Sequence, residues 1–136
     1  MTHRTGYALV ILAAAALAAA FGTTRAQTFD GTWTLVEVDG RRVQPAAGQQ
    51  APAFTIEGNT IKGFDGCNTF QGRLDRPGSI TSTRRGCLPD VLRLPLDLAD
   101  PRAHLAAARV EGQRLRLPAR NGLPESVVTS TINRAQ

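Results

Sequence analysis

The chain has 136 residues, 42% of them hydrophobic and 20% charged, and a formal net charge of +5 at pH 7. This length favours a single domain, and the composition is ordinary for a globular protein. Nucleic-acid-binding proteins carry a basic face interleaved with aromatic residues. Here the aromatic residues after the N-terminal stretch are few and fall in the first half of the chain, so we expect no nucleic-acid partner.

The first 26 residues have the pattern of a secretory signal peptide. Arg4 precedes an uncharged run at residues 8–21, and small residues lead up to Ala26. The alternative is a retained membrane anchor, but a span needs about 20 apolar residues, and no cysteine follows the run as in a lipoprotein. We therefore expect cleavage after Ala26, a periplasmic or secreted protein without a stable membrane anchor, and one domain over residues 27–136.

The two cysteines, Cys67 and Cys87, are predicted to form a disulfide. An even number of cysteines in an exported protein indicates pairing, because the compartment is oxidising. The bond would close a loop of about 20 residues, for which the chain-entropy model gives roughly 3 kcal/mol of stabilisation.

The first half of the domain shows short strands separated by turn residues. Residues 31–43 form a predicted hairpin at Asp39-Gly40, and residues 53–64 form two strands around a turn at residues 57–59. After a turn at Asp65-Gly66, further strands are predicted over residues 67–74 and 79–87. The last of these is expected to end at Cys87.

Residues 88–105 break this rhythm, because they are rich in leucine but interrupted by prolines. Pro95 prevents a long helix, whereas Asp100 followed by Pro101 is a typical helix start. We expect irregular structure up to residue 100, one short helix from Pro101 to Ala107, and leucines that cover one end or face of the sheet.

The strand pattern then returns to the end of the chain. Arginine and leucine alternate over residues 114–117, as in a half-buried strand with its leucines inside. Asn121-Gly122 predicts another tight turn, and residues 125–132 a closing strand. The sequence therefore predicts a mainly β protein: a small antiparallel, barrel-like sheet, curled or closed, with one short helix.

The order of these motifs resembles the META domain, the HslJ-like heat-shock protein family. The similarity rests on GTWTLVEVDG, AFTIEGNTIKGFDGCNTFQGRL, TSTRRGC and VEGQRLRL, and covers about residues 30–132. The resemblance implies a small β-rich envelope domain linked to stress tolerance, without an established catalytic activity. The chain departs from the family after its second cysteine, where an acidic helix is usual and Pro95 stands here.

The stretch GFDGCNTFQGR, residues 63–73, allows three interpretations. A nucleophilic Cys67 would need His104 as its base, and Cys87 competes for the thiol. Two cysteines and one histidine fall short of a closed zinc site, and Asp65 and Asn68 are too few for a calcium loop. We therefore expect no catalytic, metal or cofactor site, and a structural role for a set of turn and core residues: Trp33, Gly63, Asp65, Gly66, Asn68, Phe70 and Gly72.

Two functions remain open for a monomeric domain of this kind. The first is a non-enzymatic module that binds an envelope protein or a surface polymer. The second is a lipocalin-like carrier of a small apolar ligand, which inward-facing Trp33, Phe54 and Phe70 would exclude by filling the interior. Arg41-Arg42, Arg84-Arg85 and His104 are expected to be surface or half-buried residues rather than ligands.

Overall fold

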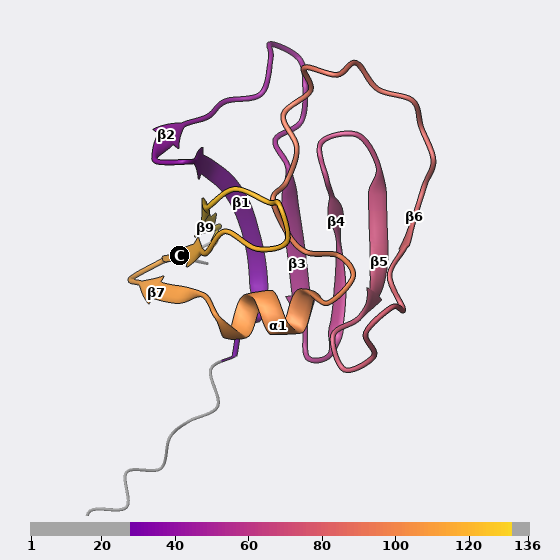
Figure 1. Ribbon diagram of the computed structural model, residues 1–136, viewed down its shortest axis with the longest axis vertical. Coiled ribbons are helices and arrows are strands. Elements are labelled where there is room, and N and C mark those ends of the chain that lie inside the picture. The colour runs from indigo at the N-terminus through magenta and orange to yellow at the C-terminus, as the bar shows by residue number, and fades with distance from the viewer. Residues whose placement is uncertain (1–27, 132–136) are drawn as a thin grey trace, which may run out of the picture.

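The computed structural model describes residues 28–131, which form a nine-stranded sheet and one short helix (Figure 1). The predicted signal peptide, residues 1–26, and the predicted end of the last strand at Ile132 lie outside the described residues. The elements in chain order are β1 (Gly31–Val38), β2 (Arg41–Arg42), β3 (Ala53–Glu57), β4 (Thr60–Phe64), β5 (Thr69–Arg73), β6 (Thr81–Ser82), α1 (Pro101–Ala106), β7 (Arg109–Glu111), β8 (Arg114–Leu117) and β9 (Ser126–Ser130).

The sheet is antiparallel and curled, with the order β6-β5-β4-β3-β1-β9-β8-β7 and β2 paired to β1. Within residues 28–131 its two outer strands, β6 and β7, do not pair with each other. The predicted curled sheet with one helix is confirmed, whereas the closed barrel is wrong. β6 has only two residues, and the chain leaves the sheet after Ser82.

The hairpin turns form where the sequence places them. Asp39 and Gly40 have φ values of 49° and 75°, and Asn121 and Gly122 have φ values of 48° and 81°. Positive φ at both central residues is the type I′ geometry, which matches the twist of the flanking strands. Alternation along β8 is also as predicted, because Leu115 and Leu117 are fully buried and the neighbouring Arg114 and Arg116 are not.

The core fills the concave side of the sheet. It combines alternate residues of the strands with leucines from outside the sheet, namely Trp33, Leu35, Phe54, Ile56, Ile61, Phe70, Leu74, Leu94, Leu96, Leu105, Leu115, Leu117 and Val128. Trp33 donates its indole N–H to the carbonyl oxygen of Phe29 at 2.8 Å. The largest ring of the core is therefore both packed and hydrogen-bonded.

Residues 83–100, called the covering segment below, run irregularly from β6 to α1 across the concave side (Figure 1). Leu94 and Leu96 are buried, as predicted, but Leu88 is 71% exposed. The predicted strand over residues 79–87 is wrong beyond Ser82, and all residues from Thr83 to Asp90 are exposed. The helix ends one residue earlier than predicted, and Asp100 caps it by accepting the N–H of Ala103 at 3.1 Å.

Candidate functional site

The predicted disulfide between Cys67 and Cys87 is present, with 5.9 Å between the two Cα atoms. Cys67 is buried just before β5, and Cys87 is exposed in the covering segment. The bond therefore joins the β4–β5 turn to an irregular segment and not, as the sequence suggested, to the end of a strand. Both thiols are used in this bond, so neither cysteine is free to act as a nucleophile.

Asp65 organises the turn that precedes Cys67. Its Oδ1 accepts the backbone N–H of Cys67 at 2.8 Å and that of Asn68 at 2.6 Å, which is the pattern of an Asx turn. The backbone of Asp65 accepts the N–H of Leu94 at 2.8 Å. The same residue therefore closes the turn and attaches the covering segment to it.

Asn68 makes the second attachment to the covering segment. Its Oδ1 accepts the backbone N–H of Arg85 at 2.6 Å and the hydroxyl of Thr83 at 3.0 Å. The backbone N–H of Arg85 is a donor that a longer β6 would have used to pair with β5. It donates to the side chain of Asn68 instead. This is the physical reason that the predicted strand stops early.

The glycines of the motif permit close packing. The ring of Phe70 lies where a side chain at Gly63 would project, and Ile80 lies where one at Gly72 would project. Gly66 has a φ of +104°, and a Cβ atom there would overlap the carbonyl oxygen of Leu92. The residues of this motif attach the covering segment to the β4–β5 turn and form a part of the core. They are called the structural cluster below.

His104 is fully buried, so its predicted placement at or near the surface is wrong. Its Nδ1 accepts the backbone N–H of Asp97 at 3.1 Å, which leaves Nε2 to donate to the carbonyl oxygen of Pro118 at 2.8 Å. Both ring nitrogens have a partner inside the protein. His104 therefore joins the covering segment to the end of β8 and has no access to Cys67 as a base.

Asp97, which the sequence did not single out, completes this buried network. Its Oδ2 accepts from Nε of Arg120 at 2.9 Å and from the amide of Asn121 at 3.1 Å. The hydrogen bond from Arg120 is the main reason that the pKa of the Asp97 carboxyl lies below its usual value, and burial opposes it. An aspartate between two leucines, LDL at residues 96–98, carries no sequence pattern that would reveal such a partner.

Within residues 28–131, no group of three metal-ligating side chains stands together. The helix in this part of the chain is too short to cross a membrane. The arginine pairs Arg41-Arg42 and Arg84-Arg85 are exposed, and none of the four has an ion pair among the described residues.

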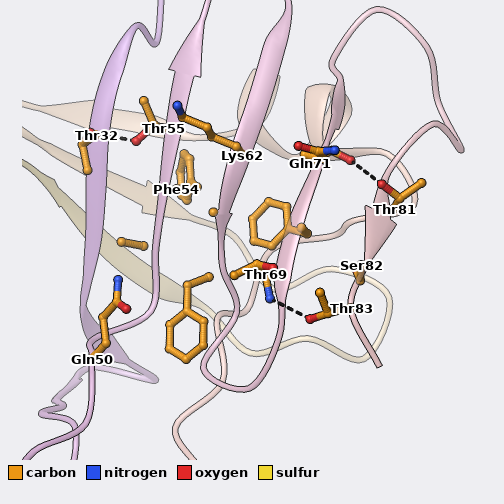
Figure 2. A pocket seen from close by; sticks show the side chains of 14 residues that line it. Thr32, Gln50, Phe54, Thr55, Lys62, Thr69, Gln71, Thr81, Ser82 and Thr83 are labelled. Carbon is orange, nitrogen blue, oxygen red and sulfur yellow. Dashed lines mark hydrogen bonds between the residues drawn. The ribbon is translucent and has the colours of Figure 1, made fainter. Parts of the chain in front are cut away.

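The outer face of the sheet carries a groove made of two adjoining hollows. Figure 2 shows the larger one, of about 700 Å³, and the second, of about 410 Å³, continues it along the strands. Thr55, Lys62, Gln71 and Thr81 line both hollows. Strand pairing places these four residues in one row across β3, β4, β5 and β6, and Thr32 of β1 extends it.

This row exists because the strands alternate. Gly63 and Phe70 face the core, so their neighbours Lys62 and Gln71 face outward. Thr32 and Thr55 share a hydrogen bond of 2.8 Å between their hydroxyls, and the ammonium group of Lys62 extends toward Thr55 (Figure 2). This surface was not predicted from the sequence, although the polar alternate residues of the predicted strands contained the signal.

A protein-family model matches the region that contains the Cys67 motif described above. The META domain family model matches residues 26–130. Comparison with the curated proteins and with the solved structures finds no match. The matched stretch covers most of the chain and includes both cysteines and every residue of the structural cluster, and the chain therefore belongs to the META domain family.

Proposed function

We propose that this META-domain protein is an exported, non-enzymatic component of the cell envelope that acts by binding a protein or an envelope polymer. Export is supported by the signal-like pattern of residues 1–26 and by the disulfide, which an oxidising compartment favours. A link to stress tolerance follows from the family resemblance alone.

The observation that carries the binding proposal is the groove on the outer face of the sheet. Its larger hollow presents hydroxyl and amide groups around one lysine, Lys62, and its second hollow adds Glu57 and Arg73. A few polar groups in a concave surface provide orientation and specificity for a ligand.

The chemistry of the other candidate residues supports a non-enzymatic role. The cysteines are joined, and the single histidine of residues 28–131 is buried with both ring nitrogens bonded. An activated nucleophile needs an adjacent base that can reach it. Cys67 and His104 do not provide that pair here.

The lipocalin-like carrier is disfavoured by the packing of the concave side. Trp33, Phe54 and Phe70 are 8%, 1% and 3% exposed and lie in one core cluster. A carrier of this kind encloses its ligand in the sheet interior, which these rings fill.

Two measurements test the proposal. The protein is first recovered from the fractionated source cells, and its intact mass is determined. We expect a chain that starts at Gln27 and is two hydrogens lighter than the dithiol form. A cytoplasmic protein that retains residues 1–26 would contradict export.

Binding is then tested by crosslinking the exported protein to the envelope fraction of the same cells. We expect capture of a reproducible component, and loss of that capture in Lys62→Glu. Arg109→Glu, which changes an exposed residue of β7 by the same charge, is the matched control and should capture normally. Equal capture by both variants would exclude the groove as the binding surface.

A further inference from the structure

We infer that the groove binds a segment of an acidic polysaccharide, with one sugar carboxylate at Lys62 and sugar hydroxyls on the surrounding threonine and glutamine side chains. This inference rests on the proposed binding function and names the ligand class of the same surface.

Lys62 supplies the charge. It is exposed at the middle of the row of groove residues, and among residues 28–131 it has no ion pair. The larger hollow is lined by no other charged residue. A lone ammonium group acts as a point charge without the bidentate fork of arginine, and it matches one singly charged carboxylate.

The remaining groups suit a ligand rich in hydroxyls. Hydroxyl and amide side chains both donate and accept hydrogen bonds, as sugar hydroxyls also do. Thr55, Gln71 and Thr81 stand in the shared row, and Thr69 and Thr83 lie in the larger hollow. The half-buried ring of Phe64 adds one apolar surface against which the C–H face of a sugar ring can pack.

The same features disfavour the other classes of polymer. A protein interface normally centres on large buried anchors such as Trp, Tyr or Arg, and the larger hollow offers none of these at its surface. Nucleic-acid binding needs several cations along a phosphate backbone, and this hollow has one. An apolar ligand would leave the hydroxyl groups without partners.

The shape of the groove favours an extended ligand. The two hollows adjoin along the strand direction, from Phe64 and Thr69 at one end to Thr60 and Arg73 at the other. Four residue steps of a strand span about 13 Å, which suits an extended ligand. The second hollow also carries Arg73, which is paired with Asp75 at 2.8 Å, and the carboxylate of Glu57. Lys62 is therefore the unpaired cation of the groove within the described residues, and we place the sugar carboxylate on its larger-hollow side, away from Glu57.

The test compares two probes that differ only in charge: an oligogalacturonate and the same oligomer with its carboxylates methyl-esterified. Binding to the oxidised protein is measured by calorimetry at low salt, and the site is located by NMR shifts of the strand amides. We expect the acidic probe to bind at least about tenfold more tightly than the ester, with shifts centred on β4 and β5.

Three variants locate the interaction. Lys62→Gln should reduce the affinity for the acidic probe to that for the ester and leave the ester unchanged. Thr55→Val should weaken both probes, because it removes a hydroxyl from the row. Arg109→Gln removes an exposed cation on β7 and should leave both affinities unchanged. Thermal unfolding of each variant confirms that it is folded.

Several outcomes would overturn the inference. Equal binding of both probes would exclude a role for the carboxylate, and equal losses in Lys62→Gln and Arg109→Gln would indicate a general charge attraction. Absence of binding at millimolar probe would exclude this ligand class. If envelope capture still depends on Lys62 in that case, the proposed function stands and only the ligand class fails. If capture is also absent, both fail.

Discussion

Replacement of Gly66 by alanine should destabilise the protein by detaching the covering segment from the β4–β5 turn. Gly66 has a φ of +104°, and an added Cβ atom would overlap the carbonyl oxygen of Leu92. The overlapping atom belongs to the backbone and cannot rotate away like a flexible side chain. The covering segment must therefore shift near Leu92 to accommodate the methyl group.

Gly31 provides a matched control for the backbone strain. Its φ is +121°, and a Cβ atom there would have no neighbour within 4 Å. Both alanine variants therefore carry a positive-φ strain of about 1–3 kcal/mol, and only Gly66→Ala adds a clash. The difference between the two variants isolates the contact with the covering segment.

The excess loss at Gly66 follows from two interactions near the clash. The hydrogen bond from the N–H of Leu94 to the carbonyl of Asp65, 2.8 Å long, contributes about 1 kcal/mol. Partial loss of packing by Leu94, which is 7% exposed, costs about 1–3 kcal/mol. We therefore expect Gly66→Ala to lose about 2–4 kcal/mol more than Gly31→Ala, against a total stability of about 5–15 kcal/mol.

The assay is urea denaturation of the oxidised variants, followed by the fluorescence of Trp33, with the midpoint and slope fitted together. Hydrogen exchange of the Leu94 amide provides a local readout and should accelerate in Gly66→Ala alone. If the two alanine variants lose the same stability and protect this amide equally, the turn does not support the covering segment and the reasoning fails.

Two further predictions concern the covering segment. Reduction of Cys67–Cys87, or replacement of both cysteines by serine, should lower the free energy of unfolding by about 3 kcal/mol, because a loop with a sequence separation of 20 is released in the unfolded chain; an unchanged urea midpoint under reductant would contradict this. Asp97→Asn should cost about 1–3 kcal/mol at neutral pH, because it weakens the bond from Arg120. Since the folded pKa of Asp97 lies below its unfolded value, its contribution is complete above the ordinary carboxyl pKa of about 3.9 and disappears as the pH falls through the folded pKa. Denaturation of both proteins from pH 7 to pH 2 should therefore show their difference shrinking only in acid, and a difference independent of pH would exclude the charged network.

Local signals in the sequence were sufficient for most of the fold. The turns at Asp39-Gly40 and Asn121-Gly122 follow from residues that tolerate positive φ. The helix start follows from Asp100 and Pro101, because a capping carboxylate and a fixed φ act within one turn of chain. Each of these features is determined by residues that are adjacent in the sequence, so it can be predicted from a short stretch of the chain.

The features that were predicted wrongly from the sequence depend on contacts between residues far apart in the chain. The strand expected up to Cys87 ends at Ser82, because the side chain of Asn68 binds the backbone at Arg85 across a separation of 17 residues. His104 is buried because Asp97 and Pro118 satisfy its ring, and neither is predicted by the helical pattern around it. Side-chain bonds to distant backbone groups have no periodicity in the sequence.

The strands β4 and β5 carry the core on one face and the proposed binding groove on the other. Gly63 and Phe70 face inward beneath the covering segment, while Lys62 and Gln71 beside them face the groove. Because successive strand residues point to opposite sides, a one-residue change of register would exchange the two sets. The disulfide and the Asp65 turn fix the end of this hairpin, and thereby the register that keeps Lys62 on the outer face. The stretch GFDGCNTFQGR, residues 63–73, would therefore act on the proposed ligand indirectly, by holding the strands that present the groove.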